Sequence, residues 1–240
     1  MLPLYAVEGP KRRAVTLGII AANIAVFLGE LFYTNGLDPC LENQLFYSYG
    51  LVPYSLTSGI QLSLQCSTGN LYAVGSSPVV YLTPITSMFI HSGFLHIAGN
   101  MLFLFVFGGN IEARLGRAKY LASYLACGLA GAVAMIATSL AVGPPNIYVP
   151  GVGASGAISG VMAAYLVLYP RAPIISIIGY FIIPVRAFWF IGAWFALQVL
   201  YQLGGVDTGV AYAAHIGGFA LGLGIALLVR ATSRGAEARY

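Results

Sequence analysis

Charged side chains are scarce in this sequence. Only 8% of its 240 residues are Asp, Glu, Lys or Arg, whereas 59% are hydrophobic. Soluble domains carry about 25% charged residues, so the deficit excludes an ordinary water-soluble globular protein. The net charge of +4 follows the membrane topology described below and gives no indication of nucleic-acid binding.

Acidic residues, histidines and cysteines are also few: seven Asp and Glu, three His and three Cys. We expect Cys127, which lies in an apolar run, to serve packing. Cys40 and Cys66 share the one long connecting segment, where a disulfide is chemically permitted but not required by the sequence. No cysteine or carboxylate shares a helix face with the histidines, so we expect neither a metal site nor a cofactor.

Long apolar runs are the main feature that is present. Several reach the roughly 20 residues that a helix needs to cross a hydrocarbon core, and their apolar residues are continuous rather than alternating. The sequence therefore predicts an all-α, polytopic membrane bundle, one domain over residues 1–240. The six expected transmembrane helices span residues 14–32, 88–110, 119–142, 155–169, 187–203 and 210–229. The fourth is short, although the apolar stretch continues beyond Pro170 and Pro173.

The basic residues are distributed as six spans require. All 11 Lys and Arg lie before the first span, in the second and fourth connections or at their boundary with a span (Lys119), or after the sixth span. Because short basic loops stay in the cytoplasm, both termini are expected there and the 33–87 loop outside. This loop has no Lys or Arg and is rich in Tyr and Leu. We expect short interfacial helices within residues 45–64, with a flexible extracellular loop as the alternative.

Glycine is abundant, with 30 copies, and two spans carry it at a spacing of four residues. Gly156 and Gly160 share a face of the fourth span, and Gly218 and Gly222 share a face of the sixth. Small residues at this spacing let helix backbones approach closely in a membrane. We therefore expect the fourth and sixth spans to be in contact.

Strongly polar side chains are costly inside a bilayer and therefore mark functional candidates. His91, His96 and Asn100 lie on or beside the second span, Ser155 opens the fourth, and His215 lies early in the sixth. At about 1.5 Å per helical residue, these groups fall within roughly 10 Å of the outer boundary. Three separate segments thus place a serine, an asparagine and histidines in one layer.

This set of groups suits acyl transfer. A serine hydroxyl needs an adjacent base, and His215 is the candidate base for Ser155. The Asn100 amide, the His96 ring and the Ser155 backbone N–H are candidate donors to a developing oxyanion, the last at the positive end of a helix. Asp207 is the only acid near His215 in sequence, and no acid is clearly placed to orient that ring. We therefore predict a Ser–His dyad rather than a triad.

Each of these residues taken alone also has a structural interpretation. A serine at a glycine-rich helix start is commonly a cap, and a membrane histidine is commonly a structural hydrogen-bonding group. Two further functions stay open as alternatives. A non-catalytic module that binds membrane proteins would use the same fold. A small transporter would prefer polar residues along a path through both leaflets, whereas the inner half offers almost nothing ionisable.

Four motifs in the chain resemble those of the rhomboid intramembrane serine proteases. Residues 153–156 (GASG) resemble the family's GxSG nucleophile motif, and residues 91–100 (HSGFLHIAGN) resemble its histidine pair followed by HxxxN. Residues 214–218 (AHIGG) with Gly222 resemble the sixth-helix histidine and GxxxG, and residues 112–116 (EARLG) are similar to ExRLG. The motifs occur in family order, and the resemblance extends from the first span to the sixth.

The resemblance implies a six-helix core of the prokaryotic type, and hence a multi-pass protein of a prokaryotic cell membrane. It implies Ser155 as nucleophile, His215 as general base, and oxyanion stabilisation by Asn100, His96 and the Ser155 backbone. Residues that match supporting motif positions are His91, Gly153, Gly156, Gly218 and Gly222. The implied substrates are single-span membrane proteins, cut near the outer membrane boundary at small residues, and no cofactor is implied.

Two features depart from the family pattern. Members often carry an aromatic residue four positions after the nucleophile, stacked on the histidine, where this chain has Ser159. The sequence therefore leaves the orientation of His215 open. The first outer loop of many members also carries a Trp-Arg pair, which is absent here, so its membrane anchoring must differ. Both catalytic residues are present, unlike in the inactive relatives.

Overall fold

The bundle of helices predicted from the apolar runs is present. The computed structural model describes residues 1–6, 13–60, 62–65, 71–74, 79–206 and 208–237. Each predicted span overlaps a helix, and the bundle helices are α1 (Ala14–Tyr33), α5 (Phe94–Leu115), α6 (Arg117–Val142), α7 (Ser155–Leu168), α8 (Ala187–Leu203) and α9 (Tyr212–Glu237). Within the described residues, α1, α5, α6 and α9 are long and apolar enough to cross a membrane, whereas α7 and α8 are shorter apolar helices.

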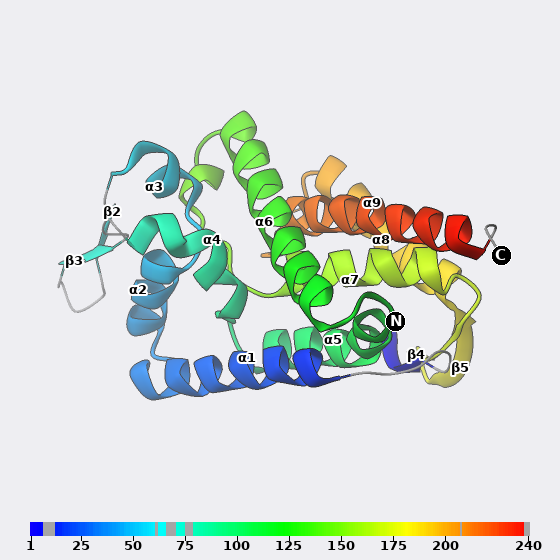
Figure 1. The fold of residues 1–240 in the computed structure, drawn as a ribbon. Helices are drawn as coiled ribbons and strands as arrows, with labels where there is room; N and C mark the ends of the chain where they lie inside the picture. The colour runs from blue at the N-terminus through cyan, green and yellow to red at the C-terminus, as the bar shows by residue number, and fades with distance from the viewer. Residues whose placement is uncertain (7–12, 61, 66–70, 75–78, 207, 238–240) are drawn as a thin grey trace.

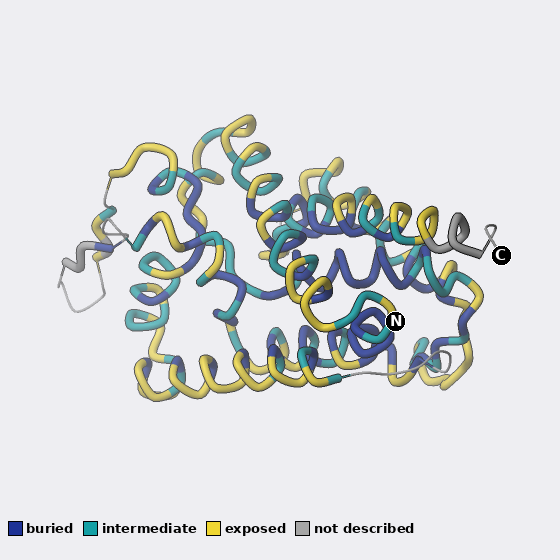
Figure 2. The backbone as a smooth tube through the Cα atoms, viewed as in Figure 1, coloured by how far each residue is buried: buried dark blue, intermediate teal, exposed yellow. Residues whose placement is uncertain are grey.

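Helix α7 lies at the centre of the bundle, and most of its residues are buried (Figure 2). It packs against α5, α6, α8 and α9. A helix that is apolar all round belongs in an interior. Because other helices surround it, its 14 residues need not match the thickness of the hydrocarbon core.

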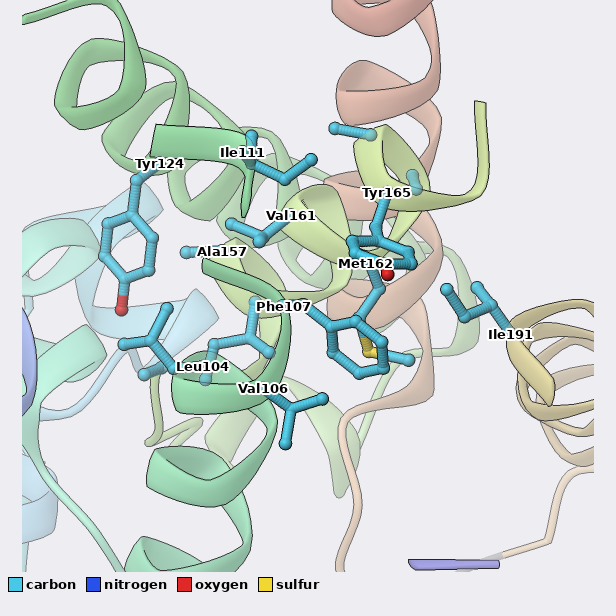
Figure 3. Packing of buried hydrophobic residues seen from close by; sticks show 14 of the residues in the cluster. Leu104, Val106, Phe107, Ile111, Tyr124, Ala157, Val161, Met162, Tyr165 and Ile191 are labelled. Carbon is cyan, nitrogen blue, oxygen red and sulfur yellow. The ribbon is translucent and has the colours of Figure 1, made fainter. Parts of the chain in front are cut away.

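Aromatic and aliphatic side chains join α5 to α7 (Figure 3). Leu104 and Phe107 of α5 are fully buried, as are Met162 and Tyr165 of α7. The rings of Phe107 and Tyr165 meet edge to face, with their centroids 5.1 Å apart. This packing fixes the spacing between the helix that carries the second-span polar residues and the helix that begins at the candidate nucleophile.

The glycine faces of α7 and α9 meet, as the sequence predicted. A Cβ atom at Gly218 would overlap the carbonyl group of Gly156, and one at Gly222 would overlap the backbone of Gly160. No side chain therefore separates the two backbones at this crossing. The close approach brings the first turn of α9 beside the first turn of α7.

The second span is displaced relative to the prediction of residues 88–110. Residues Ser87–Phe89 form a 3₁₀ turn (η2), and α5 begins only at Phe94 and continues to Leu115. Gly93, with φ at 141°, separates the two elements, a conformation that glycine adopts freely. Hydropathy identifies the apolar stretch but cannot detect this backbone break, so the predicted span begins too early. The last turn of α5 is polar, so the predicted span also ends before the helix does.

The apolar stretch after α7 forms a β-hairpin instead of extending the fourth span. Strands β4 (Pro173–Ile178) and β5 (Phe181–Arg186) pair antiparallel, and β1 (Leu2–Ala6) pairs with the other edge of β4 in the order β1-β4-β5. Pro170 and Pro173 disfavour a continued helix, and the isoleucine-rich run suits strands. This small sheet adds to the helical fold at the end of the bundle where α9 finishes (Figure 1).

The opposite end of the bundle carries the long connection between α1 and α5 (Figure 1). Its described elements are α2 (Pro39–Tyr49), α3 (Pro53–Ser58), β2 (Leu62–Gln65), β3 (Leu71–Val74), η1 (Val79–Leu82), α4 (Thr83–Thr86) and η2; η3 (Asn146–Tyr148) lies between α6 and α7. Short helices were expected here, and their interfacial position stays a prediction. Cys40 is disulfide-bonded, and Cys66 lies outside the described residues. Cys127 is free and buried, as expected.

Glu112 connects the end of α5 to the start of α1. Its carboxylate accepts hydrogen bonds from the backbone N–H groups of Val15 (3.0 Å) and Thr16 (2.8 Å) and from the Thr16 hydroxyl (2.9 Å). The first N–H groups of a helix have no partner within the helix and lie at the positive end of its dipole. The glutamate of the EARLG motif therefore anchors the first helix to the bundle.

Replacing Glu112 with alanine is expected to lower the free energy of unfolding by about 2–4 kcal/mol, because it leaves buried donors of α1 without a partner. The Glu112→Gln variant keeps one acceptor oxygen, so its free energy of unfolding should fall by about half as much. Thermal unfolding of the purified protein in detergent checks both values. A Glu112→Ala melting temperature equal to that of the wild type would contradict this role.

Candidate active site

Ser155 and His215 lie in hydrogen-bond contact. The distance from the serine Oγ to the histidine Nε2 is 2.7 Å, across 60 residues of sequence. Ser155 is the first residue of α7, and His215 lies in the first turn of α9 and is only 8% exposed. A hydroxyl and an imidazole at this distance are the components of an activated nucleophile.

The segment before Ser155 is held by the connection between α1 and α5. The Gly153 N–H donates to the carbonyl of Ser87 at 2.8 Å, and Gly151 exchanges two hydrogen bonds of 2.9 Å with the backbone of Leu51. Gly153 has φ at 116°, which side-chain-bearing residues rarely adopt. The nucleophile therefore follows a backbone turn that is held by hydrogen bonds at Gly151 and at Gly153.

His96 and Asn100 of α5 converge on this turn. A Cβ atom at Gly153 would lie 2.7 Å from Nε2 of His96 and 3.8 Å from Nδ2 of Asn100. The Asn100 amide also donates to the carbonyl of His96 at 3.0 Å, which orients it along the helix. The layer of polar groups expected from the sequence thus forms around residues 153–155.

The His96 ring presents a donor to this layer. Its Nδ1 accepts a hydrogen bond from the Ser92 backbone N–H at 3.3 Å, and the Ser92 hydroxyl lies 3.0 Å from the same atom. Because a backbone N–H can only donate, Nδ1 of the neutral ring carries no proton. The ring proton is therefore on Nε2, the atom that faces Gly153.

Replacing Gly153 with alanine is expected to lower kcat at least tenfold, because the methyl group would displace the His96 ring and strain the turn. Gly143→Ala is the matched control: Gly143 also has a positive φ, 82°, but a Cβ atom there would meet nothing within 4 Å. Turnover of a membrane substrate by both variants checks this. Equal activity in the two variants would show that crowding at residue 153 is unimportant.

The Ser159 side chain hydrogen-bonds within its own helix. Its hydroxyl donates to the backbone carbonyl of Ser155 at 2.6 Å, one turn earlier in α7. The His215 ring is supported instead from α8, where Gln198 Oε1 lies 2.8 Å from Nδ1 and the Trp194 ring lies 5.7 Å away, centroid to centroid. The Tyr212 ring adds an edge contact at 6.5 Å.

Gln198 and Trp194 are the site residues that the sequence reasoning missed. One signal was available, since Gln198 is one of two glutamines, with Gln202, in a mostly apolar predicted span, and polar groups at such positions mark functional candidates. Asp207, the one acid considered as a partner for His215, lies outside the described residues.

His91 lies behind His96 as a supporting group. It is fully buried, and the two rings meet edge to face with centroids 5.1 Å apart. Its Nδ1 lies 3.2 Å from the carbonyl of Phe89, and its backbone N–H donates to the Glu30 carboxylate at 3.4 Å. Within the described part of the chain, no three His, Cys, Asp or Glu side chains gather into a metal-binding group.

A cavity lies beside the Ser155 side chain. Small residues form much of its lining, among them Gly128, Ala132, Gly151 and Ala211, and no charged residue contributes to it. Such a cavity offers room for a small apolar side chain next to the nucleophile.

The sequence of this chain is similar to those of known proteins. Residues 78–232 match a family model described as the Rhomboid domain. The chain is 30% identical over 217 residues to Rhomboid protease AarA of Providencia stuartii, an alignment that covers 87% of this chain and 70% of that protein. It is 33% identical over 148 residues to Rhomboid protein 1, mitochondrial, of Saccharomyces cerevisiae, covering 58% and 39% of the two chains. It is also 30% identical over 227 residues to RHOMBOID-like protein 12, mitochondrial, of Arabidopsis thaliana, covering 89% and 58%.

Proposed function

The chain belongs to the rhomboid family, and on that premise we propose that it is an intramembrane serine endopeptidase that works through a Ser155–His215 dyad. The 2.7 Å contact between Ser155 Oγ and His215 Nε2 carries this proposal. A structural serine cap or a packing histidine would not require the two side chains to meet, whereas nucleophilic catalysis does.

The dyad would act by acyl transfer. As Ser155 Oγ attacks the carbonyl carbon of the scissile peptide, its proton passes to His215 Nε2 and the carbonyl electron pair moves onto oxygen. Collapse of this intermediate breaks the C–N bond, and the leaving amine takes the proton from Nε2. Water then attacks the acyl ester, with Nε2 accepting its proton. Collapse of this second intermediate breaks the C–Oγ bond, and Oγ takes the proton back from Nε2, so the carboxylic acid and the free serine are released.

Three donors would stabilise the oxyanion. The Ser155 N–H lies in the first turn of α7, where backbone N–H groups have no partner within the helix. The Nε2–H of His96 and the Asn100 amide face the preceding turn at Gly153. Fixed donors aimed at developing charge in a water-poor site supply a large part of the rate enhancement in such reactions.

The proposed substrates are single-span membrane proteins, cut near the outer membrane boundary at small residues. The small-residue lining of the cavity beside Ser155 supports this preference. The proposed orientation places both termini in the cytoplasm of a prokaryotic cell. In support, β1 and the end of α9 lie at one end of the bundle, opposite to α2 and α3 (Figure 1).

Cleavage in lipid vesicles tests the proposal. The purified protein is reconstituted with a tagged single-span substrate that carries alanine or glycine near its outer boundary, and the products are identified by mass spectrometry. The wild type should release two fragments from a cut within the membrane-proximal segment, and the Ser155→Ala variant should release none. Substrate capture without any product, equal in both proteins, would support a non-catalytic binding module instead.

A further inference from the structure

We propose that Gln198 is a positioning residue for catalysis, an amide that holds the His215 ring in the tautomer able to act as base. This inference rests on the proposed function, in which His215 accepts the Ser155 proton. The Gln198 side chain occupies the place behind the histidine that an acid would take in a triad. It lies on α8, a different helix from either member of the dyad.

The orientation of the amide follows from its second contact. Gln198 Nε2 donates to the backbone carbonyl of Trp194 at 3.3 Å, one turn earlier in α8. A carbonyl oxygen can only accept, so the amide nitrogen must be the atom that faces Trp194. The amide oxygen, Oε1, is therefore the atom that faces His215, at 2.8 Å from Nδ1.

The orientation of the amide in turn sets the proton on the ring. Oε1 can only accept, so Nδ1 of His215 carries the proton and donates it to Gln198. The neutral ring then has its free electron pair on Nε2, which lies 2.7 Å from the Ser155 hydroxyl. After proton transfer the imidazolium still donates from Nδ1 to the same oxygen, so the ring keeps its place through the reaction.

A neutral amide suits this location better than a carboxylate. Gln198 is 7% exposed and His215 is 8% exposed, both within helices of the membrane bundle. A buried carboxylate would carry a large desolvation penalty and would favour the protonated form of the ring before substrate binds. The amide fixes the tautomer without adding charge.

Helix α8 also supplies the aromatic contact that the Ser159 position lacks. Trp194 and Gln198 are four residues apart, so they project from one face of the helix. The Trp194 ring lies at 33° to the His215 ring, with centroids 5.7 Å apart. One face of α8 thus provides both a hydrogen-bond acceptor and a packing surface for the catalytic histidine.

Kinetics of three variants test this role. Gln198→Leu removes the acceptor at similar size and should lower kcat by roughly 10- to 100-fold, with KM within about twofold of the wild type. Gln198→Glu keeps an acceptor oxygen but adds a charge that favours the protonated ring, so it should restore only part of the lost kcat. Gln202→Leu, the same change one turn later on α8, should leave kcat unchanged. A Gln198→Leu variant with wild-type kcat, or equal losses at residues 198 and 202, would overturn the proposal.

A measurement on the resting protein tests the tautomer without any substrate. The chain has only three histidines, so a ¹⁵N-histidine-labelled sample gives a simple NMR spectrum, in which the His215 signals are identified by their loss in His215→Ala. The wild type should show His215 with the proton on Nδ1, and Gln198→Leu should lose this preference. A wild-type ring protonated on Nε2 would overturn the inference even if the protein is active. Absence of cleavage with the expected tautomer would instead defeat the proposed function alone.

Discussion

Alanine at Ser155 or at His215 is expected to lower kcat/KM for a membrane substrate by on the order of a thousandfold or more, and the double replacement should lose no more than either single one. The reason lies in their contact. The hydroxyl is a nucleophile only when Nε2, 2.7 Å away, takes its proton, so either change removes the same reaction path.

The rates should be measured in vesicles with a fluorescent single-span substrate, and thermal unfolding should confirm that each variant is folded. Ser139→Ala, which alters a half-buried serine of α6 that belongs to no part of the site, is the control and should cleave at the wild-type rate. Losses that multiply in the double variant would mean that the two residues act independently, which is incompatible with a dyad.

Gly218→Ala is expected to affect both the fold and the activity strongly. The added methyl group would overlap the carbonyl of Gly156, a backbone atom that cannot rotate aside, so α7 and α9 must separate. Overpacking of a tight interface destabilises proteins by about 1–3 kcal/mol or more, and here we expect the upper part of that range. Separation would also lengthen the Ser155–His215 contact, so kcat should fall with the stability.

Gly224→Ala on the same helix is the matched control. A Cβ atom at Gly224 would meet nothing within 4 Å, and alanine favours a helix over glycine by about 0.5–1 kcal/mol. This variant should melt at or slightly above the wild-type temperature and keep full activity. A Gly218→Ala protein as stable and as active as Gly224→Ala would show that the close approach of α7 and α9 is not required.

Features set by local composition could be predicted from the sequence. An apolar run marked every helix of the bundle, because each run must lie in the protein interior or against lipid whatever its neighbours are. The glycine spacing of α7 and α9 predicted their contact, because only a side-chain-free face permits it. Ser155, His215, His96 and Asn100 were found together because strongly polar groups in apolar helices are rare.

Features that depend on helix rotation and backbone breaks could not be predicted. The contact between Gln198 and His215 depends on how α8 turns about its axis, which an apolar helix does not specify through its own sequence pattern. The start of α5 depends on the conformation of Gly93, and hydropathy is insensitive to backbone angles. The sheet that follows α7 is completed by pairing of β4 with β1, far earlier in the chain.

The most direct test of the central claim is covalent labelling of the resting protein with a fluorophosphonate, which forms a phosphonyl ester with an activated serine and releases fluoride. Peptide mass spectrometry should locate a single adduct on Ser155 of the wild-type protein in detergent or vesicles. The adduct should be absent from Ser155→Ala and from folded His215→Ala, because the hydroxyl is unreactive without its base. Labelling of folded His215→Ala at the wild-type rate, or an adduct on a different serine, would contradict the assignment of Ser155 and His215 as a catalytic dyad.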